Sequence, residues 1–226
     1  MSLAGAGWAE GAAGSLFSAR QPLFHLPKAT PARADAGAEA ASLFVGRVDG
    51  GLFAALPGRF DAPLRVGGTK AARLRDLIGH AEAGRKGYDA VQHGARVKPP
   101  RTPTAMTLQE IHDWIAATPG QPHAIGRYQF IPETLRHSAR RLGLKPSTRF
   151  SPATQDRLAN LLLGDAGLTK ALAGEITQEA FMLNLAKIWA GFPTPGGRSY
   201  YHGIAGNKAT MTYADYARQV RDILGG

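Results

Sequence analysis

The stretch KAARLRDLIGHAEAG, residues 70–84, decides how the chain folds. Its apolar side chains recur at the i, i+3, i+4, i+7 spacing that is typical of an amphipathic helix, and they are Leu74, Leu77, Ile78 and Ala81. Gly84 follows, and glycine commonly ends helices because it adopts the left-handed conformation that closes the last turn. The spacing therefore predicts a helix over residues 70–83 with one face in a core.

Glu82 lies on the same face of this helix, four residues after Ile78 and eight after Leu74. Its place in the last turn, near the negative end of the helix dipole, disfavours a negative charge, and partial burial acts in the same direction. Both effects are expected to raise the pKa of Glu82 and to hold its proton near neutral pH, which is what a general acid needs. The alternative is an exposed glutamate at a frayed helix end.

Further helices are predicted from capping signals and apolar periodicity. Thr107 with Glu110 three residues later has the pattern of a capping box, and prolines stand at first-turn positions that suit them. The predicted helix starts are Thr107, Pro132, Ser151-Pro152, Thr177 (for a helix through Trp189) and Thr212, with a short helical segment around residues 168–172. Residues 88–92 and 95–98 are predicted to pair as a small hairpin. We therefore expect a mainly α (α+β) body with a small β or irregular insert.

Residues 1–65 are a different kind of segment, rich in alanine and glycine and interrupted by prolines. Such a composition does not build its own core, so alone this extended segment is expected to be flexible. A Leu-Phe pair followed by arginine recurs in residues 14–20 and 41–47, which suits a docking peptide for the groove of a protein partner. The sequence thus divides into a low-complexity, anchoring segment over 1–65 and a helical domain over 66–226.

Composition and charge limit the function classes. The 226 residues include no cysteine, which excludes a disulfide scaffold, a cysteine nucleophile and a cysteine-ligated metal site. The histidines lack the pairing with acids that a metal site needs, so no metal is expected. The net charge is +10, of which residues 66–226 carry +9 (21 basic minus 12 acidic side chains), and polyanions are the expected partners. No apolar run reaches the roughly 18 residues of a membrane span, and the N-terminus lacks the pattern of a secretory signal.

Two loops carry side chains that suit carbohydrate. In AIGRYQFIP, residues 124–132, Tyr128 offers a flat face and a hydroxyl, and Gln129 offers both donors and an acceptor. In residues 188–202 a helix is expected to end near Trp189 in a loop rich in glycine and proline that continues to Tyr200. Sugars require that combination of stacking and hydrogen bonding. The alternative is structural, with Tyr128 in a core turn and Trp189 in the core.

These motifs and their order resemble the endolysins of the phage lambda lysozyme type, which are lytic transglycosylases of the lysozyme-like superfamily. The resemblance covers residues 77 to about 201, over half of the chain, and rests on residues 81–84, 87–89, 126–129, 142–144 with 150–156, and 188–190. It implies a lysozyme-like helical domain in which Glu82 is the catalytic acid. The residues expected to contact substrate are Tyr88, Arg127, Tyr128, Gln129, Trp189 and Tyr200. The sequence also departs from this family. The insert between Tyr88 and Tyr128 has its own helix, in which Asp113 and Trp114 have no counterpart, the loop after Trp189 is longer, and residues 1–65 are foreign to the family. The resemblance implies that no cofactor is needed.

The resemblance also implies a reaction. Its substrate is the β-1,4 bond between N-acetylmuramic acid (MurNAc) and N-acetylglucosamine (GlcNAc) in peptidoglycan, and the C6 hydroxyl of the sugar attacks to give a 1,6-anhydro end. Hydrolysis instead uses two carboxylates about 5 Å apart or somewhat further. Asp89, seven residues after Glu82, is the candidate second carboxylate, and it is alternatively a cap of the turn after Tyr88.

Two other function classes stay open. In the first alternative, residues 66–226 form a module that binds the cell wall without cleaving it. Residues 1–65 then dock this module to a larger assembly, which is a virion or a secretion machine. Nucleic-acid binding is disfavoured, because the basic residues are scattered and no recognition helix is visible. An enzyme of this kind without a secretory signal is expected to act in the bacterial cell wall or periplasm after delivery by a holin, a secretion apparatus or a virion.

Overall fold

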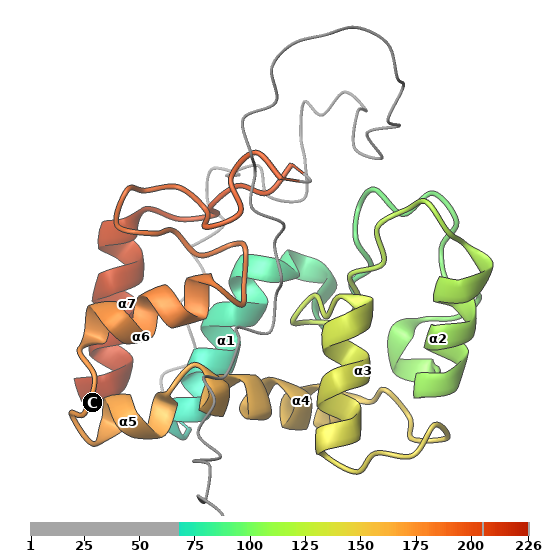
Figure 1. The fold of residues 1–226 in the computed structure, drawn as a ribbon, viewed down its shortest axis with the longest axis horizontal. Helices are drawn as coiled ribbons and strands as arrows, with labels where there is room; N and C mark the ends of the chain where they lie inside the picture. Colours follow the sequence, from blue (N-terminus) through green and yellow to red (C-terminus); the bar gives the residue numbers. More distant parts are fainter. Residues whose placement is uncertain (1–67, 205, 226) are drawn as a thin grey trace, which may run out of the picture. The chain divides into compact units, whose positions relative to one another are not determined.

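The computed structural model describes residues 68–204 and 206–225, and the expectations for residues 1–65 lie outside these ranges. The described part is mainly helical, as predicted. Its helices are α1 (Lys70–Glu82), α2 (Leu108–Ala117), α3 (Pro132–Arg141), α4 (Pro152–Asp165), α5 (Leu168–Leu172), α6 (Gln178–Ala186) and α7 (Tyr213–Gly225), with two short 3-10 helices, η1 (Gly84–Asp89) and η2 (Pro103–Ala105) (Figure 1).

The helix starts follow local signals in the sequence. The side chain of Thr69 accepts a hydrogen bond from the amide of Ala72 at the start of α1. Thr107 and Glu110 form the predicted capping box of α2, and the side chain of Ser151 caps α4. Each contact satisfies an amide at the helix start that has no partner within the helix. The predicted starts of α2, α3, α4, α6 and α7 are confirmed.

The helix predicted from Thr177 through Trp189 is shorter than expected, since α6 ends at Ala186. The amide of Ile188 donates to the carbonyl of Leu185 in the tighter i→i−3 pattern, and the amide of Trp189 makes a regular i→i−4 bond to the same carbonyl. Helical hydrogen bonding therefore reaches Trp189 although the regular helix ends earlier. In the loop that follows, the amide of Gly191 donates to Glu82.

The predicted hairpin between residues 88–92 and 95–98 is wrong. Val91 pairs instead with Ile125 in an antiparallel bridge, and the amide of Gln92 donates to the carbonyl of Ala124 at 2.8 Å. The second segment turns away at once, because the amide of Ala95 donates to the carbonyl of Gln92 at 3.1 Å. The pairing with Ile125 buries two β-branched side chains together.

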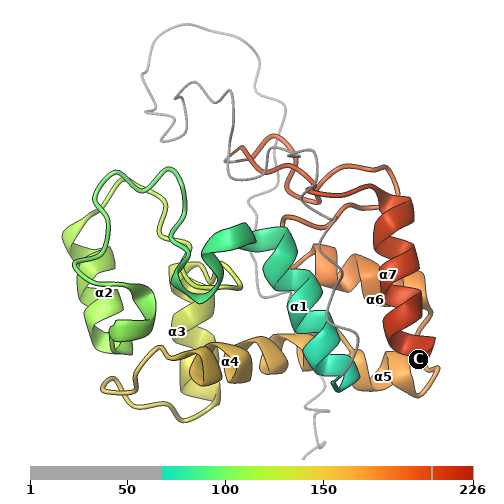
Figure 2. The same cartoon turned by 180° about the vertical axis from the view of Figure 1, so that it is seen from behind.

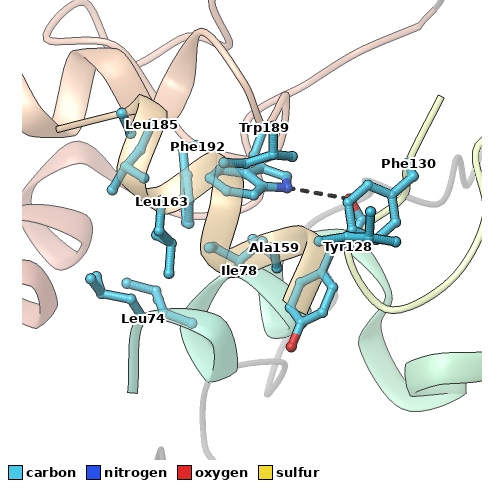
Figure 3. Close-up of a cluster of buried hydrophobic side chains, with 14 of the residues drawn as sticks. Leu74, Ile78, Tyr128, Phe130, Ala159, Leu163, Leu185, Trp189 and Phe192 are labelled. Carbon is cyan, nitrogen blue, oxygen red and sulfur yellow. Dashed lines mark hydrogen bonds between the residues drawn. The ribbon is translucent and has the colours of Figure 1, made fainter. Parts of the chain in front are cut away.

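Helix α1 holds the described body together. It contacts α4 and α7, while α3 contacts α4 and α6 contacts α7. Figures 1 and 2 show α1 between the α6–α7 pair and the part of the chain that carries α2 and α3. The core beneath it joins α1 to α4, α6 and the loop after α6, and it includes Leu74, Ile78, Ala159, Leu163, Leu185, Trp189 and Phe192 (Figure 3). None of the helices in residues 68–204 and 206–225 has the length and apolar character that crossing a membrane requires.

Candidate active site

Glu82 is the last residue of α1, and its side chain is only 3% exposed. Its position on the buried face of the helix is as predicted, and the alternative of an exposed glutamate at a frayed end is wrong. Its Oε1 atom accepts a hydrogen bond of 2.8 Å from the backbone amide of Gly191, in the loop after α6. A carboxyl group is therefore held in the interior between two elements that are far apart in the sequence.

The backbone of Gly191 lies so close to α1 that a side chain at this position would make tight contacts. A Cβ atom at this position would lie 3.0 Å from both the carbonyl oxygen of Ala81 and Oε1 of Glu82. Its own carbonyl accepts two hydrogen bonds from Thr210, one from the amide at 2.9 Å and one from the hydroxyl at 3.0 Å. The Gly191 residue is thus fixed on both sides, and no other residue type fits between α1 and this loop without displacing one of them.

The predicted carbohydrate loop at residues 124–132 forms a tight turn. Ile125 and Phe130 pair in an antiparallel bridge and leave Gly126 to Gln129 as the connection. Gly126 has a φ of +79° and Gln129 a φ of +45°, and the latter is strained because Gln carries a Cβ atom. The side-chain amide of Gln129 donates to the carbonyl of Gly126 at 2.9 Å. Its Oε1 atom is buried and has no hydrogen-bond partner among the described residues.

Trp189 joins this turn to the loop that carries Gly191. Its Nε1 atom donates to the carbonyl of Tyr128 at 3.3 Å, and the side chain is 2% exposed (Figure 3). The two loops predicted to suit carbohydrate therefore meet. The ring of Trp189 is part of the core, so the alternative of a structural role for this residue fits its placement.

Tyr88 and Tyr128 direct their hydroxyls into the protein. Both donate to Oδ1 of Asp156, at 2.9 and 2.5 Å. Burial, and then the bond to this carboxylate, raise the pKa of both tyrosines above their ordinary value, so they remain phenol donors. The ring of Tyr128 is buried against that of Phe130. Neither Tyr128 nor its hydroxyl is presented to a ligand in this arrangement.

Arg127 lies across α1 and is engaged as well. Its guanidinium donates to Asp76 at 2.7 Å and lies 5.0 Å from the centre of the Tyr88 ring. It passes directly over Gly79, where a Cβ atom would come within 2.2 Å of its Nε atom. Gly79 thus allows Arg127 to tie the Gly126–Gln129 turn to α1.

Gln155 of α4 is a central residue of the site to which the sequence interpretation gave no role. Its side chain is fully buried and makes three hydrogen bonds. Its Oε1 atom accepts from the amide of Arg127 at 2.8 Å, and its Nε2 atom donates to the carbonyls of Tyr88 and Phe150, both at 3.0 Å. A signal was present, because Gln155 lies three residues before Leu158 on the buried face of α4.

The remaining two candidates are Asp89, the last residue of η1, and Tyr200, in the loop between α6 and α7. Asp89 is exposed and accepts a hydrogen bond of 2.9 Å from the amide of Thr104, so it ties η1 to η2 instead of capping the turn after Tyr88. Tyr200 is 45% exposed, and the Lys187 ammonium lies 6.0 Å from the centre of its ring. Tyr200 is therefore the most exposed of the predicted aromatic residues. Within residues 68–204 and 206–225, no group of three histidine, aspartate or glutamate side chains is placed to hold a metal ion.

Comparisons with known proteins give one finding. A family model with the description Endolysin matches residues 74–219, which run from within α1 to within α7 and include every candidate site residue. No curated protein and no solved structure matches the chain.

Proposed function

The chain belongs to the Endolysin family, whose members are phage enzymes that degrade the bacterial cell wall, and from this premise we propose that it cleaves the MurNAc-β-1,4-GlcNAc bond of peptidoglycan as a lytic transglycosylase. Glu82 acts as general acid and then as general base. The observation that supports this role is the burial of its carboxyl group against the amide of Gly191.

The environment of Glu82 suits a group that must release and recover one proton. Burial disfavours the charged carboxylate, which favours the protonated acid before reaction. The amide of Gly191, 2.8 Å from Oε1, favours the carboxylate once the proton has been given up. A group that alternates between acid and base needs both kinds of influence.

The reaction uses this one proton twice. Glu82 protonates the glycosidic oxygen, the bond from that oxygen to C1 of MurNAc breaks, and GlcNAc leaves with a free O4 hydroxyl. The C6 hydroxyl of MurNAc then bonds to C1, and its proton passes to the Glu82 carboxylate. The product carries a 1,6-anhydro ring, no water is consumed, and Glu82 ends in its starting state.

The other carboxylates near this part of the fold have structural partners, which supports the single-acid route over hydrolysis. Asp89 binds the amide of Thr104, Asp156 accepts from two tyrosines, and Asp76 pairs with Arg127. A retaining glycosidase would need one of them about 5 Å from Glu82 as nucleophile, and an inverting one would need one about 6.5–9.5 Å away as general base. We assign these three aspartates to holding the fold.

The predicted substrate residues divide into two groups under this proposal. Tyr88, Arg127, Tyr128 and Trp189 hold the turn and the loop in place through the contacts described above. Gln129 and Tyr200 contact substrate. The Oε1 atom of Gln129 is buried and has no hydrogen-bond partner among the described residues, so an N-acetyl N–H would satisfy it only where the substrate reaches this turn, and the exposed Tyr200 suits the face of a sugar.

Product analysis tests the reaction type. Purified sacculi are digested with the protein, and the released fragments are identified by mass spectrometry. We expect MurNAc ends that are lighter by one water than reducing ends. Reducing ends would instead identify a hydrolytic muramidase. Binding to sacculi without released fragments would favour the alternative of a wall-binding module of a virion or secretion machine.

Delivery through residues 1–65 stays a prediction, because these residues lie outside the described ranges. The proposal is that they dock to a carrier while residues 66–226 reach the wall. Deleting residues 1–65 is then expected to preserve cleavage of purified sacculi in vitro and to abolish lysis that depends on the carrier. Loss of lysis together with loss of cleavage in vitro would contradict this division of roles.

A further inference from the structure

We propose that Thr210 is a positioning residue for Glu82: by holding the carbonyl of Gly191, it keeps the Gly191 amide against the carboxyl group. This inference rests on the proposed function, since it assigns to Thr210 the control of the group that acts as acid. Thr210 does not touch substrate in this role. It acts through one glycine.

The contact from Thr210 to Gly191 is double and buried. The Thr210 side chain is 1% exposed, and its amide and hydroxyl donate to the same carbonyl oxygen at 2.9 and 3.0 Å. Two donors on one carbonyl occupy both of its lone pairs and fix its direction. Because the amide of Gly191 is attached to the same Cα atom, fixing the carbonyl restricts where that amide points.

The loop around Gly191 is anchored on other sides too. The ring of the next residue, Phe192, stacks on Tyr216 of α7 with centroids 4.4 Å apart and planes 10° apart. The hydroxyl of Tyr216 donates to the carbonyl of Met182 in α6 at 3.1 Å. The loop that carries Gly191 is therefore anchored to α6 and α7, whereas Glu82 belongs to α1. Thr210, which lies just before α7, adds a direct contact to Gly191.

Glycine at position 191 makes the arrangement sensitive to small displacements. The contacts of 3.0 Å that a Cβ atom would make with Ala81 and Glu82 show that no spare space separates the loop from α1. A hydrogen bond weakens steeply when its angle or length departs from the ideal. A loop released from Thr210 can move only away from α1, and that movement lengthens the bond to Glu82.

The chemical consequence concerns the proton on Glu82. A weaker bond from the Gly191 amide removes a contact that favours the carboxylate, so the acid should hold its proton to higher pH. The carboxylate that must accept the C6 hydroxyl proton would also be less stabilised. Loosening Thr210 should therefore move the basic limb of the pH–rate profile upward and lower kcat.

The test compares Thr210→Val with Thr210→Ser and with Thr134→Val, a matched control at a buried threonine of α3. Valine keeps the branched shape and the backbone amide but removes the hydroxyl, whereas serine keeps the hydroxyl. We expect Thr210→Val to lower kcat for release of soluble glycan by about 3- to 10-fold, the worth of one neutral hydrogen bond, with an upward shift of the basic limb. Thr210→Ser and Thr134→Val should keep the wild-type profile. An unchanged profile in folded Thr210→Val would overturn the proposal.

A second measurement on the wild-type protein covers the case in which Thr210→Val does not fold. The NMR resonance of the Gly191 amide should follow the titration of Glu82, and this response should disappear in Glu82→Gln. A Gly191 amide that is insensitive to that titration would also overturn the positioning role. If the wild-type protein cleaves no glycan, the proposed function fails, and the NMR result still decides whether Gly191 and Glu82 are coupled.

Discussion

Replacing Gln155 by methionine removes three hydrogen bonds from the interior while changing little else. Methionine has a similar length, and its helix propensity is close to that of glutamine. The substitution leaves the amide of Arg127 without its side-chain partner and takes one donor each from the carbonyls of Tyr88 and Phe150. The perturbation therefore isolates the polar contacts of a fully buried side chain.

The magnitude follows from those three contacts. A typical hydrogen bond contributes about 1 kcal/mol, and a buried group left without a partner costs about 1–3 kcal/mol. One orphaned amide and two weakened carbonyls together give an expected loss of about 3–5 kcal/mol in the free energy of unfolding. Since small proteins are stable by about 5–15 kcal/mol in total, this loss would be a large part of the whole.

Urea unfolding followed by tryptophan fluorescence measures this loss, with linear extrapolation to zero denaturant. Gln109→Met is the matched control, because Gln109 is an exposed residue of α2 whose side chain donates to the side chain of Asp113, while its backbone amide keeps its bond to Pro146 in the variant. We expect the control to change stability by less than about 0.5 kcal/mol. A loss below about 1 kcal/mol for Gln155→Met, or equal losses for both variants, would show that these three hydrogen bonds contribute little to stability.

Three other predictions test separate parts of the fold. Gly79→Ala should destabilise despite the gain of up to about 1 kcal/mol that alanine brings to a helix, because its Cβ atom would displace Arg127; a more stable variant by urea unfolding would contradict this. Burial lowers the pKa of His123 more than its bond to Thr118 raises it, so the unfolded state binds the proton first and stability should fall as pH drops below about 6.5. Unfolding midpoints at pH 7.5 and 5 should therefore differ less in His123→Gln than in wild type, and an equal difference would be the contrary result. Thr107→Ala should cost about 1 kcal/mol in thermal or urea unfolding through loss of the α2 cap, and an unchanged midpoint would argue against that cap.

The parts of the fold that the sequence predicted well depend on neighbouring residues. The start of α2 follows from Thr107 and Glu110, which lie within one turn of each other. The burial of Glu82 follows from its place on the face of Leu74 and Ile78. In each case the signal and the structure it predicts lie on the same helix.

The parts that the sequence did not predict depend on distant partners. Val91 pairs with Ile125, which is distant in the sequence. The local pattern on both sides of His93 therefore led to the wrong prediction of a hairpin. Gly191 and Glu82 are 109 positions apart in the sequence, and no local pattern near either residue predicts their contact. Tyr128 shows a third limit, because its ring suits both a sugar face and a core, and only its burial separates the two roles.

The most direct test of the account is the rate at which Glu82→Gln releases soluble fragments from purified peptidoglycan. Glutamine keeps the size of the side chain and an oxygen for the Gly191 amide, but it supplies no transferable acid proton. We expect the variant to bind sacculi and unfold like the wild type, while the cleavage rate falls by about 10²- to 10⁴-fold. Cleavage by folded Glu82→Gln within a few-fold of the wild-type rate would contradict the assignment of Glu82 as the acid.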